Sequence, residues 1–170
     1  MSEKIQHTKQ CGKNPKILIL HDIRSILNVG AIFRTADAIK IDKIYLTGYT
    51  PAPIDRFGRK RSDLAKSALG AEKIVKWESF GNVFELISLL KSEGFEILSL
   101  EQSDNSIDYK KVANTLSEKT VIILGNETDG VDKKILQQSD KIIEIPMKGN
   151  KESLNVSVAV GILLYRLFDK

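Results

Sequence analysis

Short apolar runs rich in β-branched residues alternate along the chain with longer amphipathic segments. The apolar runs predict strands at residues 16–23, 43–48, 73–79, 96–102, 120–126 and 141–147. The amphipathic segments predict helices at residues 28–40, 81–93, 132–138 and 154–168. Strands separated by helices at this spacing are typical of a mostly parallel sheet, and several strands are apolar on both sides, as burial between two helix layers requires. The predicted fold class is therefore α/β, with a single domain and helices covering both faces of the sheet.

Composition and charge narrow the class of protein. The chain has 170 residues, of which 42% are hydrophobic and 28% charged, as expected for one globular domain with a sizeable core. No internal repeat or linker divides it, so we assign residues 16–170 to the domain and residues 1–15 to a flexible basic arm. The net charge of +4 suits an anionic partner such as RNA without requiring one.

Cysteine and histidine usage limits the possible chemistry. Cys11 is the single cysteine, and the two histidines form no cluster with the spacing of metal ligands. We therefore expect no disulfide, no metal site and no redox chemistry. The N-terminal segment lacks the apolar core of a signal peptide, and no apolar run reaches the roughly 20 residues of a membrane span. We expect a soluble protein that acts in the cytoplasm, with no membrane partner.

A glycine-bounded polar segment, GNETDG at 125–130, follows the strand predicted at 120–126. Ligands of open α/β sheets bind beyond the carboxyl ends of the strands. The simpler interpretation of this hexapeptide is a turn before a helix that Asp129 or Asp132 caps. Alternatively, the two glycines let the backbone approach a ligand while Glu127 points a carboxylate into the cleft. The motifs that bind ATP or NAD phosphates are absent, so neither nucleotide is expected.

The first predicted helix carries one unexpected charge. Its apolar residues fall at helical spacing and form a stripe that faces the core, and Asn28 is placed to cap the helix. Arg34 lies within this apolar segment and would be costly to bury without an anionic partner. An ion pair with Asp37, three residues further on, is the simpler explanation of Arg34.

Near the C-terminus, the polar segment KGNKES opens directly into an apolar helix. Ser153 and Asn155 could cap this helix, but so many polar groups at the mouth of a buried element also suit a binding site. From Ser153 to Tyr165 the chain has no charged residue. This pattern predicts a helix that is buried on every side, because it is too short to cross a membrane.

The loop at 51–61 concentrates positive charge around Phe57. Its cationic residues are Arg56, Arg59, Lys60 and Arg61. A solvated surface loop is the simpler interpretation. Because the loop follows a strand end, its cations are also suited to phosphate contacts, with Phe57 available to stack on a base. Given the family resemblance described next, we favour contact with RNA.

Three ordered segments together resemble a known family. They are Asn28–Arg34 (NVGAIFR), Gly125–Gly130 (GNETDG), and the stretch from Ile145-Pro146-Met147 to Ser153-Leu154-Asn155. They are similar to the three motifs of the SPOUT superfamily, in its TrmH-type branch of RNA ribose 2′-O-methyltransferases. The resemblance covers residues 16–168 and includes Lys66–Glu72. One departure is Thr128-Asp129, since a glycine often follows the glutamate in relatives.

The resemblance implies a fold, a cofactor and a reaction. It implies a C-terminal trefoil knot, which is an exception to the rule that chains avoid knots. It also implies that S-adenosylmethionine donates a methyl group to a ribose 2′-hydroxyl of tRNA or rRNA. We favour tRNA, because the chain has no additional N-terminal domain of the kind that many rRNA-specific relatives carry. The implied cofactor-binding residues are Leu100, Gly125, Asn126, Ile145, Met147, Ser153 and Leu154.

The resemblance also implies a catalytic set and a dimer. The catalytic set is Asn28, Arg34, Glu127, Ser153 and Asn155. We favour Arg34 as a phosphate clamp over Arg34 as a base, because a free guanidinium has a pKa above about 12. By pKa Glu127 is the better acid–base candidate, or else it orients Arg34 and Asn155. The family's homodimers pair the first and last helices, which would bring Arg34 of one subunit to the cofactor site of the other.

Two other classes of function stay open. The chain could be an inactive SPOUT-like RNA-binding module, or it could methylate a base nitrogen instead of a ribose. A more distant alternative is a flavodoxin-like nucleotide-binding domain.

Overall fold

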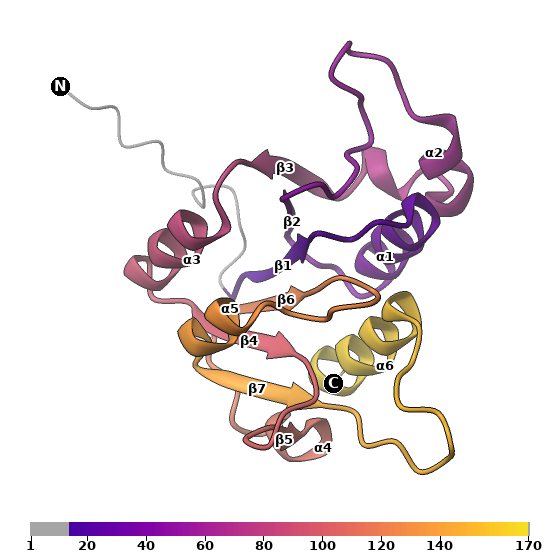
Figure 1. The fold of residues 1–170 in the computed structure, drawn as a ribbon. Coiled ribbons are helices and arrows are strands. Elements are labelled where there is room, and N and C mark those ends of the chain that lie inside the picture. Colours follow the sequence, from indigo (N-terminus) through magenta and orange to yellow (C-terminus); the bar gives the residue numbers. More distant parts are fainter. Residues whose placement is uncertain (1–13, 170) are drawn as a thin grey trace, which may run out of the picture.

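The structure is a computed structural model that describes residues 14–169. Figure 1 shows a central sheet with helices on both faces. The strands are β1 (Lys16–His21), β2 (Lys43–Thr47), β3 (Lys76–Phe80), β4 (Glu96–Leu100), β5 (Ile107–Asp108), β6 (Thr120–Leu124) and β7 (Lys141–Glu144). The helices are α1 (Ile26–Ala38), α2 (Ser62–Ala68), the 3-10 turn η1 (Ala71–Lys73), α3 (Val83–Ser92), α4 (Tyr109–Val112), α5 (Lys133–Gln138) and α6 (Val156–Phe168).

All strand pairs in the described part of the chain are parallel, in the order β3-β2-β1-β6-β4-β7-β5. The chain first builds outward from β1 through β2 to β3. It then crosses to the other side of β1, where β4 lies between β6 and β7. The carboxyl ends of all the strands therefore meet at one edge of the sheet, where the three motif segments follow β1, β6 and β7. The α/β fold class is confirmed, whereas the trefoil knot stays a prediction.

Side chains of the sheet divide between two cores because successive strand residues point to opposite faces. Leu18 and Leu20 of β1 belong to a core that α1, α2 and α6 complete. Ile17 and Ile19 belong to the other core, with side chains from α3 and α5. Figure 1 shows α1 and α6 on one side of the sheet and α3 and α5 on the other. The two helix layers predicted from the sequence are thereby confirmed.

Several element boundaries differ from the prediction. The sequence pattern missed α2, η1, β5 and α4, which are short and carry little periodicity. Strands β1, β4, β6 and β7 all end two or three residues earlier than predicted, because there the chain leaves the sheet to build loops. Helix α1 begins earlier than predicted, and Ser25 caps it by accepting a hydrogen bond from the N–H of Asn28 at 3.3 Å. The prediction that Asn28 caps this helix is therefore wrong.

Helix α6 is not buried on every side in the single chain. Val158, Ile162 and Tyr165 are 50%, 38% and 47% exposed. These positions are four and three residues apart, so they share one face, while the opposite face packs on the sheet and on α1. Full burial was therefore a wrong prediction for the isolated chain, and α6 keeps an uncovered apolar face.

Two further predictions concern the periphery of the molecule. Across residues 14–169, none of the helices combines the length and the apolar character that spanning a bilayer requires. The predicted basic arm falls almost entirely on residues 1–13, which lie outside the described residues.

Candidate functional site

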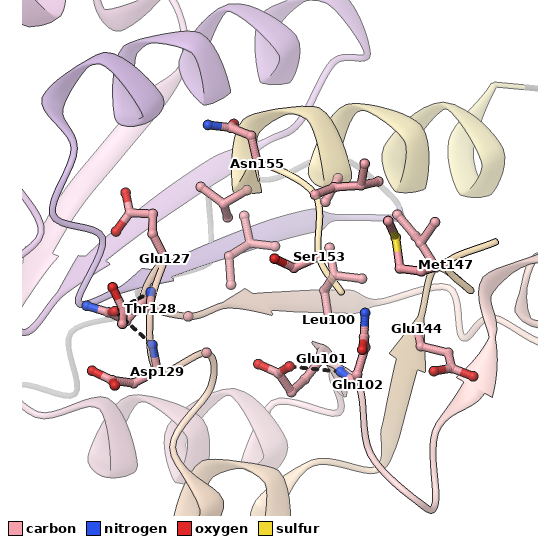
Figure 2. A pocket seen from close by; sticks show the side chains of 18 residues that line it. Leu100, Glu101, Gln102, Glu127, Thr128, Asp129, Glu144, Met147, Ser153 and Asn155 are labelled. Carbon is pink, nitrogen blue, oxygen red and sulfur yellow. Dashed lines mark hydrogen bonds between the residues drawn. The ribbon is translucent and has the colours of Figure 1, made fainter. Parts of the chain in front are cut away.

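A pocket of about 290 Å³ lies at the carboxyl edge of the sheet. Its walls come from the segments after β4, β6 and β7 and from the first turn of α6 (Figure 2). Parallel strands explain the convergence, because segments that are distant in sequence leave the sheet at the same edge. All the residues predicted to bind a cofactor line this pocket, namely Leu100, Gly125, Asn126, Ile145, Met147, Ser153 and Leu154.

The glycines of the 125–130 loop serve the loop's own fold. A Cβ atom on Gly125 would lie 2.2 Å from the carbonyl oxygen of Gly130, so only glycine fits where the loop folds back on itself. The N–H groups and carbonyls of Asn126 and Gly130 are paired at 2.9 Å in both directions. Gly130 has a φ of +70°, and a Cβ there would lie 2.0 Å from Oε2 of Glu101. These two glycines make room for protein atoms, and both also line the pocket, so the approach of a ligand to their backbone stays a prediction.

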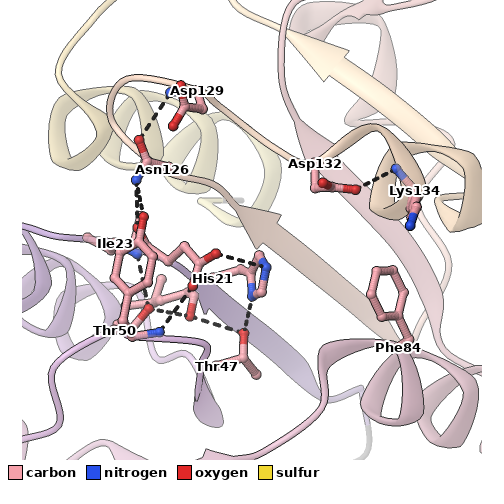
Figure 3. A network of polar contacts seen from close by, with 12 residues as sticks. His21, Ile23, Thr47, Thr50, Phe84, Asn126, Asp129, Asp132 and Lys134 are labelled. Carbon is pink, nitrogen blue, oxygen red and sulfur yellow. Dashed lines mark hydrogen bonds and ion pairs between the residues drawn. The ribbon is translucent and has the colours of Figure 1, made fainter.

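Asn126 organises the same loop with its side chain, which is buried (Figure 3). Its Oδ1 accepts hydrogen bonds from the N–H groups of Thr128 (2.7 Å) and Asp129 (3.1 Å). Its Nδ2 donates to the carbonyl of Asp22 at 3.1 Å and to the hydroxyl of Tyr49. The amide of Asn126 is therefore fully used within the protein, and the residue contributes to the pocket by shaping it.

Glu127 joins the loop to the start of α1. Its Oε2 accepts a hydrogen bond from the N–H of Arg24 at 3.0 Å. Its Oε1 accepts from the N–H of Ser25 at 3.1 Å and from Nδ2 of Asn28 at 2.9 Å. Partial burial raises the pKa of Glu127, but the donors from Arg24, Asn28 and Ser25 outweigh it and hold this pKa below its ordinary value. A carboxylate that is ionised and satisfied by three donors suits an orienting role better than acid–base catalysis, and the residue it orients is Asn28.

Asn155 extends this connection to α6. Its Nδ2 donates to Oδ1 of Asn28 at 3.1 Å. Its Oδ1 accepts from the N–H of Ser157 at 2.9 Å, which caps α6, and from the hydroxyl of Ser157 at 2.6 Å. Of the two predicted caps, Asn155 has this role, and Ser153 lies on the pocket wall. Glu127, Asn28 and Asn155 thus link the three motif segments through consecutive hydrogen bonds.

Two residues just after β4, which were not among the predicted site residues, connect the loop after β6 to the loop after β7. Glu101 accepts hydrogen bonds from the N–H groups of Val131 (2.7 Å) and Gln102 (2.8 Å). The side-chain amide of Gln102 donates to the carbonyl of Glu152 at 2.7 Å. Both residues line the pocket, as does Glu144 at the end of β7. Their position at strand ends was the available signal, since the same reasoning singled out the 125–130 segment.

Arg34 is separate from the pocket in the single chain. It is exposed on α1 and does not line the pocket. In residues 14–169 it makes no ion pair, so the predicted pairing with Asp37 is wrong. Arg34 lies seven residues after Leu27, which places both on the same helix face, and Leu27 is also exposed. Of the predicted catalytic set, the structure brings Asn28, Glu127, Ser153 and Asn155 to the pocket region and leaves Arg34 on an outer surface.

The 51–61 loop is an ordered turn around Asp55. The carboxylate of Asp55 accepts hydrogen bonds from the N–H groups of Phe57 (2.8 Å) and Arg59 (2.9 Å), and it pairs with the Arg59 guanidinium at 2.8 Å. The backbone N–H of Arg59 is the largest influence among those that lower the pKa of Asp55, so the carboxylate stays charged. Guanidinium carbons of Arg56 and Arg59 lie 4.8 and 5.0 Å from the centre of the Phe57 ring. The Phe57 ring contacts two cations and is still 66% exposed, so its stacking on a base stays a prediction.

The other two cationic residues of this loop are placed differently. Lys60 is exposed and pairs through its backbone with Ile54. Arg61 precedes α2, and its Nε is buried with no hydrogen-bond partner in the described part of the chain. The exposed cations of the loop are therefore Arg56, Arg59 and Lys60.

The parallel sheet and the three motif segments that hydrogen bonds join at its edge fit the RNA methyltransferase family that the sequence resembles. Comparison with known families leads to the same class of protein. The chain belongs to the SpoU rRNA Methylase family, whose sequence profile matches residues 15–165. Residues 14–169 contain no group of three or more His, Cys, Asp or Glu side chains placed to hold a metal ion.

Individual relatives and solved structures are similar over most of the chain. An uncharacterized tRNA/rRNA methyltransferase of Borreliella burgdorferi is 35% identical over 97% of this chain and 68% of its own length. The tRNA (guanosine(18)-2′-O)-methyltransferase of Escherichia coli is 33% identical over 81% of this chain and 56% of its own length. The crystal structure of the A. aeolicus TrmH/SpoU tRNA modifying enzyme superimposes with a TM-score of 0.78 at 31% identity, covering 94% of this chain and 76% of that one. The AdoMet-bound rRNA methyltransferase from Sinorhizobium meliloti has the same fold, with a TM-score of 0.81 at 24% identity over 92% of this chain and 56% of that one.

The chain spans between 56% and 68% of the length of these curated relatives. The family match, from residue 15 to residue 165, contains all three motif segments.

Proposed function

We propose that this protein transfers a methyl group from S-adenosylmethionine to a ribose 2′-oxygen of RNA in the cytoplasm, with tRNA favoured over rRNA. The observation that carries the proposal is the hydrogen-bonded chain from Glu127 through Asn28 to Asn155, which joins the three motif segments beside one pocket. Membership of the SpoU rRNA Methylase family supports it. The preference for tRNA rests on the similar E. coli and A. aeolicus enzymes, both of which act on tRNA.

The pocket suits S-adenosylmethionine in shape and charge. Apolar side chains on its walls, namely Leu100, Ile145, Met147 and Leu154, would hold the adenine ring. The lining also contains four carboxylates, Glu101, Glu127, Asp129 and Glu144, and neither lysine nor arginine. In a chain of net charge +4, this local excess of negative charge favours a cationic ligand. When bound, S-adenosylmethionine supplies an electrophilic methyl group on a positively charged sulfur.

The residues around the pocket act mainly by positioning. Methyl transfer is an in-line displacement, so the protein must hold the ribose oxygen behind the methyl carbon. Glu127 stays ionised and fixes Asn28, and Asn28 in turn fixes Asn155 at the mouth of α6. Arg34 holds an RNA phosphate, because an exposed guanidinium keeps its charge and binds phosphate strongly.

The exposed apolar surface of α1 and α6 supports a homodimer. The N-terminal ends of these helices are joined by the Asn28–Asn155 bond. We call Leu27, Val158, Ile162 and Tyr165 the apolar patch; all are exposed. A second copy of the same patch would cover it in a two-fold dimer. Arg34 shares the helix face of Leu27, so dimerisation would carry it toward the partner's pocket.

The 51–61 loop supports contact with the RNA substrate. Arg56 and Arg59 are held on the Phe57 ring, and Asp55 fixes the turn that presents them. Preorganised guanidinium groups bind phosphate oxygens at a lower entropic cost than mobile ones. The loop follows β2, whose carboxyl end lies at the same sheet edge as the pocket.

The deciding experiment is methylation of total RNA. The protein is incubated with RNA and isotopically labelled S-adenosylmethionine, and the RNA is digested to nucleosides. We expect label in a 2′-O-methylated nucleoside, and labelling that is about a hundredfold slower or more when the Arg34→Ala variant is used. Label in a base would show a base methyltransferase. Cofactor binding without any transfer to RNA would favour an inactive RNA-binding module.

A further inference from the structure

The exposed side chain of Tyr49 is hydrogen-bonded to the buried side chain of Asn126. It follows β2, and 57% of its surface is exposed. Its N–H donates to Oδ1 of Asp22 at 3.0 Å. Its hydroxyl oxygen accepts a hydrogen bond from Nδ2 of Asn126, the amide that shapes the pocket loop. Tyr49 therefore connects the end of β2 directly to the loop that follows β6.

The orientation of the Asn126 amide is fixed by its partners. The oxygen faces two backbone donors, the N–H groups of Thr128 and Asp129, and the nitrogen faces two acceptors, Tyr49 and the Asp22 carbonyl. An amide offers two donor hydrogens and two acceptor sites, and here all four are used. Because Asn126 is only 8% exposed, water cannot easily replace a lost partner.

The segment that carries Tyr49 is held in place by close contacts and hydrogen bonds of its own. Asp22 and Gly48 both have left-handed φ values, +56° and +63°. A Cβ on Gly48 would lie 1.8 Å from Oδ1 of Asp22, so glycine is required where these two turns touch. The Thr50 hydroxyl accepts from the N–H of Ile23 at 3.1 Å and donates to the carbonyl of Leu20 at 2.9 Å. Figure 3 shows this network between the ends of β1 and β2 and its connection to Asn126.

The contact between Tyr49 and Asn126 lies beside residues that form the pocket. Thr128 and Asp129 line the pocket, and they lie beside Glu127, which begins the chain of contacts to Asn28 and Asn155. If the Asn126 amide rotated away from this orientation, two backbone N–H groups of the pocket wall would lose their hydrogen-bond acceptor. An exposed tyrosine contributes little to core packing, so its hydroxyl contact is the main effect of this side chain on the fold.

We propose that Tyr49 is a positioning residue of the cofactor pocket, acting through the amide of Asn126 on the backbone of residues 126–130. The proposal assigns Tyr49 no contact with the cofactor or with the reacting atoms. It rests on the proposed function in one respect, namely that the ligand of the pocket is S-adenosylmethionine.

The first test needs no ligand. Tyr49→Phe removes the hydroxyl that accepts the hydrogen bond from Asn126 and keeps the ring. Amide hydrogen exchange then measures the protection of the backbone N–H groups in the loop. We expect the N–H groups of Thr128 and Asp129 to exchange faster in the variant, by about threefold to tenfold for the loss of one hydrogen bond. The N–H of Val131, which donates to Glu101, serves as an internal control and should keep its exchange rate. Unchanged exchange at Thr128 and Asp129 would overturn the proposal.

The second test measures S-adenosylmethionine binding by calorimetry. We expect Tyr49→Phe to bind the cofactor about threefold to tenfold more weakly, with the KM for RNA unchanged. Tyr109→Phe is the matched control, because the Tyr109 hydroxyl has no hydrogen-bond partner among the described residues. An unchanged cofactor affinity would overturn the role of Tyr49. If wild-type protein binds no S-adenosylmethionine, the proposed function fails, while the exchange experiment still decides whether Tyr49 positions the loop.

Discussion

Replacement of Glu127 by glutamine tests the connection among the motif segments most directly. The substitution keeps the size of the side chain but removes its charge and one acceptor oxygen. The remaining oxygen can face Ser25 and Asn28, which donate to the same Oε1 in the wild type. The new amide group then meets the N–H of Arg24, so two donors face each other where a hydrogen bond stood. The other two bonds change from charge-assisted to neutral.

The expected magnitude follows from these three bonds. Hydrogen bonds to a charged group contribute about 1.5–3 kcal/mol and neutral ones about 0.5–1.5 kcal/mol, so complete burial would make the substitution cost several kcal/mol. Glu127 is exposed, and water replaces part of each lost contact. We therefore expect a loss of about 1 kcal/mol in the free energy of unfolding, and a decrease in kcat/KM of about tenfold as Asn28 and Asn155 lose their orientation.

The assay is urea unfolding at several pH values, together with methyl transfer to RNA. The pKa of Glu127 is lowered below its ordinary value of 4.5, so its contribution to stability is present above that value and is lost as pH falls through the lowered pKa. The difference between wild type and Glu127→Gln should be largest near neutral pH and should vanish in acid. Glu118→Gln is the control, since Glu118 is exposed and has no hydrogen-bond partner in residues 14–169. Equal stability of wild type and Glu127→Gln near neutral pH would refute this reasoning.

Three other predictions concern the surfaces around the pocket. Arg34→Ala should lower kcat by about a hundredfold or more with cofactor affinity unchanged, because the guanidinium aligns RNA and lies outside the pocket; weaker cofactor binding in calorimetry would contradict this division of roles. Ile162→Glu should convert a dimer to a monomer in light scattering by placing a charge in the apolar patch, whereas Ile74→Glu, at another exposed apolar position, should leave the mass unchanged. Phe57→Leu should weaken RNA binding by about threefold to tenfold without altering its salt dependence, since no charge is lost. Arg59→Gln should weaken RNA binding and also reduce the slope of log affinity against log salt concentration by about one. Identical salt slopes for wild type and Arg59→Gln would exclude a phosphate contact at that position.

The sequence and its resemblance to a known family were sufficient to locate the pocket but not its internal contacts. The 125–130 segment could be predicted because it follows a strand and the ends of parallel strands converge, whereas Ile145 and Met147 were implied by the resemblance. The roles of individual side chains were harder to predict. Asn28 was expected to cap α1, yet it bonds to Glu127, which is 99 residues distant in sequence. No local pattern contains a contact of that range.

Tyr49 and Glu101 are residues whose structural roles could not be predicted from the sequence. Neither residue belongs to a motif segment, and each looks like an ordinary polar residue at a strand end. Their importance follows from what lies opposite them, namely Asn126 for Tyr49 and the N–H of Val131 for Glu101. A polar side chain becomes a structural support only when a specific buried group depends on it.

The sequence by itself determined the α/β class and the two helix layers, and its resemblance to a known family implied the segments that form the pocket. Hydrophobic periodicity determined the class and the layers because it follows from local backbone geometry, which is the same in every strand and helix. Only the tertiary structure decided that β4 lies between β6 and β7, that Glu127 joins α1 to α6 through Asn28 and Asn155, and that α6 leaves one apolar face uncovered. These features depend on strand order and on the packing of distant segments, and both are set by the balance of contacts over the whole molecule.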